Sequence, residues 1–181
     1  MTTPLVMTFV GRDRPGLVNA ISERITAAGG TWLESRLARL AGEFAGVVLV
    51  ESPEANVGAL TAALRDLEAT GLRVAIERSL GAPAPRAEKT VRLELVGGER
   101  PGIVRDVTQA LTRLGVNIES FSSAIESAPF SGAAMFRASA LLGVPEALPA
   151  DELRDALERL ATEIMVDLTV TADDPAARPD R

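Results

Sequence analysis

The chain has 181 residues, 46% of them hydrophobic, which is enough for one or two folded domains and excludes general disorder. Its net charge of −6, from 25 acidic and 19 basic residues, disfavours direct binding of nucleic acid, which needs clustered lysine and arginine. Histidine, cysteine and tyrosine are absent, so disulfides, thiol or histidine catalysis and Cys or His metal sites are excluded. No cofactor is expected.

The N-terminus and the hydropathy of the chain give an expected location. Residues 1–4 lack the basic segment followed by an apolar stretch that marks a secretory signal. No stretch approaches the 18 or so uninterrupted apolar residues of a membrane-spanning helix. We therefore expect a cytoplasmic protein that does not act at a membrane.

The first half of the chain shows alternating and helical hydrophobic patterns in a β-α-β-β-α-β order. One helix is predicted from apolar positions 17, 18, 21, 25 and 28, which fall on a single helical face. The expected elements are a strand at 5–10, a turn at 11–15, a helix at 16–28, strands at 31–40 and 44–51, a helix at 54–70 and a strand at 72–77.

The second half repeats this order at a fixed offset. Prolines 15 and 101 occupy matching places, so the offset is 101 − 15 = 86 residues, and the apolar positions of the first helix recur at that distance. The expected elements are a strand at 91–96, a helix at 102–114, strands at 117–126 and 133–142, a helix at 151–163 and a strand at 164–170. One module is therefore present twice.

Each copy is expected to be an α+β domain of the ferredoxin-like βαββαβ type, with two helices on one face of an antiparallel four-stranded sheet. We predict domain 1 at 1–79, a linker at 80–89, domain 2 at 90–172 and a flexible tail at 173–181. Since folded proteins usually pair or cover exposed sheet edges, the two sheets are expected to pair side by side.

The motif Gly-x-x-Arg-Pro-Gly occurs at 11–16 and at 97–102, between the first strand and the first helix of each copy. Asp13 and Glu99 are expected to cap the helix starts, and Pro15 and Pro101 to lie in the first helical turn. The free N–H groups of such a turn form an anion site. A free amino acid fits it, with its carboxylate on those N–H groups.

The last glycine of each motif supports a second expectation about ligand binding. Gly16 and Gly102 lack a Cβ, so a backbone or a small ligand can approach closely. The ammonium group of an amino acid needs an acceptor, for which Asp13, Glu99 and Asn117 are candidates. A purely structural interpretation stays open, because glycine and proline also serve turns that bind nothing, and Asn117 suits the start of a strand.

The chain resembles the signature of the ACT domain at residues 13–18, 100–104 and 115–119. The ACT domain is a small regulatory module that binds amino acids at domain interfaces. The resemblance covers about 4–79 and 90–172. Transferred position by position, it implies a ligand site formed by Gly11, Asp13, Pro15, Gly16, Leu17 and Val18, by Gly97, Glu99, Pro101, Gly102, Ile103 and Val104, and by Asn117 and Ile118. Thr31 stands at the first-copy position of Asn117, which makes the second copy the better candidate.

The chain is also similar to the glycine cleavage system transcriptional repressor family. The similarity lies in its two ACT-like modules and in the stretches 35–40, 127–132 and 163–168. This resemblance implies a non-enzymatic regulator that responds to glycine or a similar amino acid. It also implies a protein partner, a LysR-type transcription factor, in place of direct DNA binding. A homodimer is a further expectation.

Other functions are weaker alternatives. A separate regulatory subunit of an amino-acid metabolic enzyme would have the same fold. An enzyme such as an acyl phosphatase is suggested only by arginine in the turns. An RNA-binding module of this topology stacks bases on aromatic side chains, and aromatic residues make up only 3% of this chain.

Overall fold

A computed structural model describes residues 1–79, 89–128 and 132–172. The chain divides into two compact units, Met1–Ala82 and Pro83–Arg181, with the boundary inside the predicted linker. Most of that linker and the whole predicted tail at 173–181 lie outside the described residues. Lys89, which the sequence assigned to the linker, is the first residue of a strand.

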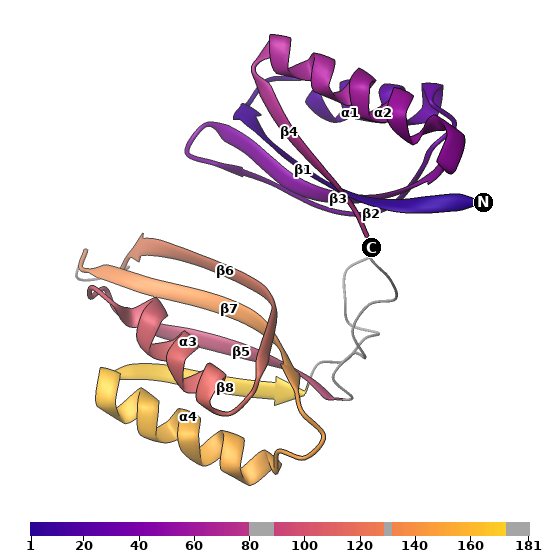
Figure 1. Cartoon of the computed structure of the whole chain (residues 1–181). Helices are drawn as coiled ribbons and strands as arrows, with labels where there is room; N and C mark the ends of the chain where they lie inside the picture. Colours follow the sequence, from indigo (N-terminus) through magenta and orange to yellow (C-terminus); the bar gives the residue numbers. More distant parts are fainter. Residues whose placement is uncertain (80–88, 129–131, 173–181) are drawn as a thin grey trace. The chain divides into compact units, whose positions relative to one another are not determined.

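The elements follow the predicted order in both units (Figure 1). The first unit contains β1 (Thr2–Arg12), α1 (Leu17–Ala27), β2 (Thr31–Leu40), β3 (Glu43–Pro53), a 3-10 turn (Glu54–Asn56), α2 (Val57–Arg65), a second 3-10 segment (Asp66–Thr70) and β4 (Leu72–Arg78). The second contains β5 (Lys89–Gly98), α3 (Ile103–Arg113), β6 (Asn117–Ser127), β7 (Ala134–Val144), α4 (Ala150–Ile164) and β8 (Val166–Ala172).

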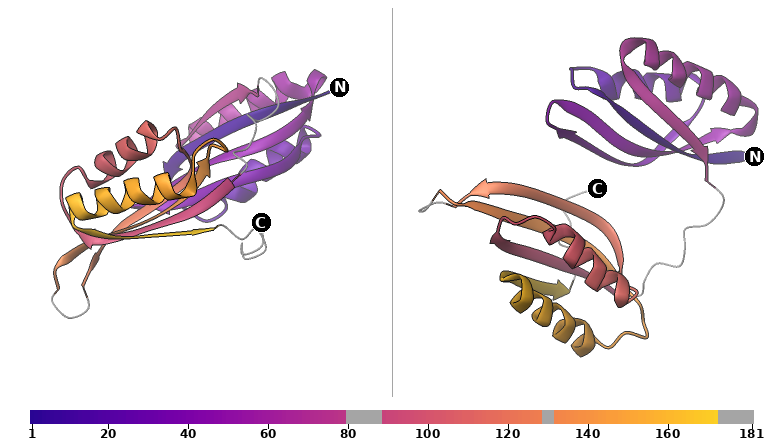
Figure 2. Two further views of the ribbon diagram at one scale, coloured as in Figure 1. Left: turned by 90° about the horizontal axis from the view of Figure 1, so that it is seen from below. Right: turned by 60° about the vertical axis from the view of Figure 1, so that its left-hand side comes forward.

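Each unit is a four-stranded antiparallel sheet, in the order β2-β3-β1-β4 or β6-β7-β5-β8. Two helices cover one face of each sheet, as the views in Figures 1 and 2 agree. The α+β, ferredoxin-like prediction is therefore confirmed for both units. Side-by-side pairing of the two sheets stays a prediction.

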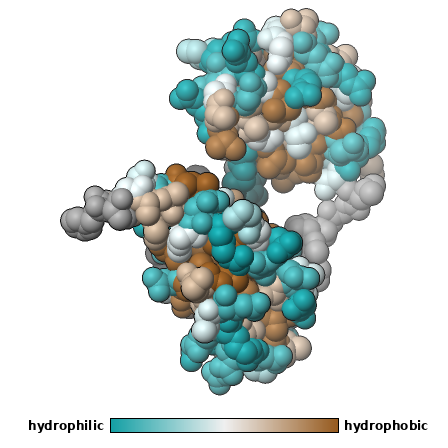
Figure 3. Space-filling view, turned by 90° about the vertical axis from the view of Figure 1, so that its left-hand side faces the viewer, coloured by the Kyte–Doolittle hydropathy of each residue, from teal (hydrophilic) through white to brown (hydrophobic). Residues whose placement is uncertain are grey.

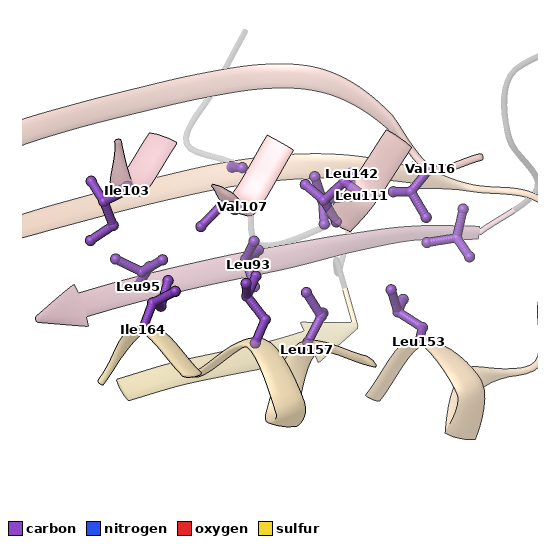
Figure 4. Close-up of a cluster of buried hydrophobic side chains, with 14 of the residues drawn as sticks. Leu93, Leu95, Ile103, Val107, Leu111, Val116, Leu142, Leu153, Leu157 and Ile164 are labelled. Atoms are coloured by element: carbon purple, nitrogen blue, oxygen red, sulfur yellow. The ribbon is translucent and has the colours of Figure 1, made fainter. Parts of the chain in front are cut away.

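A separate hydrophobic core holds each unit together, built from the central strand and the inner faces of the helices. In the second unit Leu93 and Leu95 of β5 meet Val107 and Leu111 of α3 and Leu157 of α4 (Figure 4). In the first, the corresponding β1 positions 5, 7 and 9 are at most 2% exposed. Burial of such side chains stabilises a fold by about 1.5–3 kcal/mol each.

One predicted helix is divided in the structure. The segment predicted as a single helix at 54–70 is a short α-helix, Val57–Arg65, with a 3-10 turn before it and another after it. At its end the Thr70 hydroxyl donates to the Leu67 carbonyl oxygen at 2.7 Å, which satisfies a terminal carbonyl in the tighter 3-10 geometry. The hydrophobic pattern survives, because Leu67 remains buried.

The outer strands β2 and β6 both contain a bulge at the same relative place. The register shifts between Trp32 and Glu34, and again between Ile118 and Ser120. The extra residues, Leu33 and Glu119, are 119 − 33 = 86 positions apart, so the repeat extends to backbone irregularities.

No helix among the described residues is long and apolar enough to cross a membrane.

Substitution of Gly11 can test how closely β1 approaches the start of β4. A Cβ at this position would lie 2.5 Å from the Gly71 carbonyl oxygen, so Gly11→Ala should destabilise the first unit by about 2 kcal/mol or more. Gly58 of α2 has open space where a methyl group would stand, with no atom within 4 Å, and Gly58→Ala should leave stability equal or higher. Urea denaturation followed by circular dichroism compares the two; equal losses of stability would contradict the close approach.

Candidate functional site

The two motif turns share one backbone geometry. Gly16 and Gly102 precede α1 and α3 with φ of 90° and 87°, a left-handed conformation that favours glycine. The helices begin one residue later, so Pro15 and Pro101 lie just before the helix and the prediction that they occupy its first turn was wrong. Gly16 has open space around it, so its backbone angle explains the glycine rather than a close approach.

Both helix starts leave backbone donors without an intrahelical acceptor. The first bond of α1 runs from Ala20 N to Gly16 O at 2.9 Å, and the first of α3 from Asp106 N to Gly102 O at 3.0 Å. Neither cap receives a side-chain hydrogen bond. The unpaired donors therefore belong to residues 17, 18 and 19 in one unit and to 103, 104 and 105 in the other. Three converging N–H groups suit a carboxylate.

Asp13 does not cap α1, which corrects the sequence prediction. Its backbone N donates to the Gly42 carbonyl oxygen at 2.9 Å, and its carboxylate pairs with the Arg39 guanidinium at 3.0 Å. Both partners lie at the β2–β3 hairpin. Asp13 thus ties the turn to that hairpin, and an incoming ammonium group would have to share its carboxylate with Arg39.

The turn of the first unit borders a surface pocket. Its lining combines turn residues with the start of α1 and one side chain from β3: Asp13, Arg14, Gly16, Leu17, Val18, Asn19 and Phe44. Leu17 is buried in the core, whereas Val18 is 44% exposed. The Arg14 guanidinium donates to the Thr70 carbonyl oxygen at 3.2 Å. Four of the six ligand residues predicted for this unit, Asp13, Gly16, Leu17 and Val18, therefore line one hollow, whereas Gly11 and Pro15 do not.

The second turn is organised by a carboxylate that the motif alone did not point to. Asp106 accepts from Arg100 at 2.6 Å and from Arg105 at 2.8 and 3.0 Å. These hydrogen bonds, that of Arg105 first, hold the pKa of Asp106 below its ordinary value. The sequence signal for it was an acidic residue in the first turn of α3.

Two arginines consequently stand over the second turn. Arg105 Nη2 lies 3.2 Å from where a Cβ on Gly102 would be, so the guanidinium covers that glycine. Arg100 Nε is the one buried side-chain nitrogen or oxygen in the described part of the chain without a hydrogen-bond partner. Their two formal charges are balanced by the carboxylates of Asp106 and Glu99, so the turn carries no excess charge.

The remaining turn residues have structural positions. Gly97 packs against β8, since a Cβ there would lie 2.5 Å from Val166 Cγ1. Glu99 does not cap α3; its backbone N donates to the Ala134 carbonyl oxygen at 3.1 Å. Ile103 is buried and Val104 is 40% exposed, which repeats the alternation of Leu17 and Val18.

Asn117 lies far from the turn of its own unit. The strand register aligns Asn117 with Gly143 and Thr90, at the start of β5, whereas the turn follows Gly98 at its end. Thr90 and Gly98 are eight residues apart along β5, which is roughly 27 Å at the usual rise of a strand. Ile118 packs against the core beside Asn117. One ligand cannot touch both Asn117 and the turn within a single unit. This corrects the expectation that Asn117 and the turn form one ligand site.

The family model of the ACT domain matches residues 3–77, almost all of the first unit. The glycine cleavage system transcriptional repressor of Escherichia coli K12 is 26% identical over 164 residues, which are 88% of this chain and 85% of that protein. The match therefore includes both units. The chain is a tandem ACT-domain protein.

Solved structures agree with this assignment. A crystal structure of an unknown protein from Galdieria sulphuraria is 30% identical, with a TM-score of 0.84, and covers 96% of this chain and 100% of its own. A second, of a protein assigned provisionally as a glycine cleavage system transcriptional repressor, is 22% identical with a TM-score of 0.74, covering 96% and 99%. This second likeness shows the same two-unit fold.

The Asp106 cluster predicts a pH-dependent contribution to stability. Because the folded-state pKa is lowered, the ionised carboxylate stabilises the second unit above about pH 4, and this is lost as the pH falls through the folded-state pKa. Asp106→Asn should therefore lower the free energy of unfolding at pH 7, and its difference from the wild type should shrink as the pH falls below about 4. Urea denaturation in a pH series from 7 downward measures this, with Asp155→Asn, at an exposed position, as control; a difference that does not change with pH would contradict it.

Proposed function

We propose that this tandem ACT-domain protein is a non-enzymatic, cytoplasmic regulator of transcription that senses a small amino acid. The observation that carries the proposal is the near full-length match to the Escherichia coli repressor, which spans both units. Glycine, or an amino acid of similar size, is the proposed signal, and the glycine cleavage system is the proposed target.

The proposed ligand site is the helix start in each unit. A carboxylate there accepts from the three unpaired N–H groups, where the helix dipole also favours negative charge. We place the stronger site at the α3 turn, since Arg100 and Arg105 both lie beside Asp106 there and the buried Nε of Arg100 has no hydrogen-bond partner among the described residues. A small side chain fits best, because Arg105 stands close over Gly102.

The proposed route to transcription is a protein partner of the LysR type. The net charge of −6 disfavours phosphate contact by this chain alone. A ligand would change partner binding by favouring one conformation of the protein over another. Coupling of about 1–3 kcal/mol, a factor of roughly 5–150 in partner affinity, is usual for allostery.

Ligand binding predicts a rise in thermal stability. A bound amino acid at 100 times its Kd adds about 2.7 kcal/mol, which is a shift of a few degrees in Tm. Val104→Asp places a competing carboxylate at the α3 N-terminus and should reduce the shift by the contribution of the α3 site without unfolding the helix. Val104→Thr, similar in shape and uncharged, should retain it. A panel of free amino acids, glycine and serine first, tests this by differential scanning fluorimetry; no shift with any of them contradicts amino-acid sensing.

Partner capture tests the regulatory role separately. The tagged full chain, purified from its own host with and without glycine, should retain a transcription factor, and the protein alone should not shift operator DNA at physiological salt. Co-purification with a metabolic enzyme in its place would favour a regulatory subunit and contradict the transcriptional proposal.

A further inference from the structure

Helices α3 and α4 lie side by side on the second sheet, and a groove runs between their outer surfaces (Figures 1 and 2). Ala110 of α3 and Ala156 of α4 both line this groove. Their side chains are short, so neither one closes the space between the two helices.

The first unit has an arginine at the place of Ala110. Arg24 of α1 stands 110 − 24 = 86 positions earlier, which is the offset of the repeat. Its Nε donates to the Ala63 carbonyl oxygen of α2 at 3.0 Å, and its Nη1 donates to the Ala20 carbonyl oxygen of α1 at 2.9 Å. The half-buried guanidinium of Arg24 thus lies between the two helices and bonds to both.

The backbone acceptors of Arg24 have counterparts in the groove. The buried leucines at 60, 64 and 67 are spaced like those at 153, 157 and 160, each pair 93 positions apart. Ala63 therefore corresponds to Ala156, since 63 + 93 = 156, and Ala20 corresponds to Asp106, since 20 + 86 = 106. Both Ala156 and Asp106 line the groove. The second unit keeps the two acceptor positions and lacks the arginine.

The walls of the groove suit the rest of an arginine side chain. Leu114 and Leu160 line it and offer an apolar surface to the methylene stem. A guanidinium group presents several donors in a planar fork, so it can reach acceptors on two helices at once, whereas the ammonium group of lysine is a compact point charge.

The charge around the groove favours a cation. Helix α4 carries five carboxylates and two arginines, all of them exposed, and one of the carboxylates, Glu163, lines the groove. Arg113 and Arg159 line it too, but α3 and α4 together have six acidic and four basic residues, a net charge of −2. Hydrophilic side chains, in teal, cover much of the lower, second unit in Figure 3.

We infer that this groove binds an arginine side chain from a basic segment of the protein partner. The incoming guanidinium donates to the carbonyl oxygens of Asp106 and Ala156, as Arg24 does to their counterparts, and the carboxylate of Glu163 lies at the same groove. Only the assignment of the arginine to the partner rests on the proposed function. The groove and its chemistry rest on the comparison of the two units.

The variant Ala110→Arg fills the groove with an arginine of the chain itself. It should fold and be at least as stable as the wild type in urea denaturation, because α1 already holds an arginine at the equivalent place. Thr112→Arg is the matched control. It adds the same charge to α3 at an exposed position that does not line the groove.

A peptide titration of the full chain tests the groove directly. The probe is a capped peptide with a central arginine, an alanine on each side and a lysine at each end, and amide chemical shifts of the 15N-labelled protein report binding. The wild type and Thr112→Arg should show saturable shifts along α3 and α4. Ala110→Arg should bind roughly tenfold more weakly or not at all, and so should the wild type with citrulline, which is uncharged, in place of the arginine.

Partner capture separates this inference from the proposed function. Where the wild-type chain retains a protein from its host, Thr112→Arg should retain it and Ala110→Arg should lose roughly nine-tenths of it or more. A wild type that retains no partner would contradict the proposed function, and the peptide titration would still decide whether the groove binds arginine.

The inference would be overturned by a wild type that shows no saturable shifts along α3 and α4. Equal affinity for the arginine and citrulline peptides, or equal binding by Ala110→Arg and the wild type, would have the same consequence. Self-association that Ala110→Arg abolishes and Thr112→Arg retains would assign the groove to an arginine of a second copy, and would also overturn it.

Discussion

The left-handed backbone of Gly16 and Gly102 is the constraint on which each unit depends. It turns the chain from the central strand directly into the first helix, without a capping side chain. The same angle directs the first helical side chain into the core and leaves the next one half exposed. Three N–H groups remain unpaired at the surface as a consequence, so the proposed ligand site arises from the connection that the fold requires.

The two copies have kept this turn and changed its surroundings. In the first unit Asp13 reaches across to Arg39 on the hairpin, whereas in the second Arg100 reaches back to Asp106 on the helix. The two units thus share the backbone of the turn and differ in the charges next to it.

Val104 belongs to two features of the second unit. It stands at the start of α3, where the first N–H groups have no intrahelical acceptor, and it also lines the apolar hollow beside Phe121. A ligand at the proposed site on this turn would therefore act close to that hollow, and would change it if the ligand favoured one position of α3 over another.

The sequence by itself determined the duplication, the element order and the core. Hydrophobic periodicity and an 86-residue offset are both visible in the linear sequence, whatever its fold. It also located the residues of both turns. It could not predict that Asp13 pairs with Arg39, or that Arg100 and Arg105 meet at Asp106, because side-chain partners depend on which strand ends and helix ends the fold brings together.

The tertiary structure alone decided the place of Asn117. Sequence similarity grouped it with the turn, but the antiparallel register puts it at the other end of the sheet, since α3 carries the chain the full length of the strand before β6 begins. The structure likewise decided that β6 is an edge with uncovered apolar side chains. An alternating pattern predicts a strand, whereas its neighbours, and hence its exposure, are set by the packing of the whole domain.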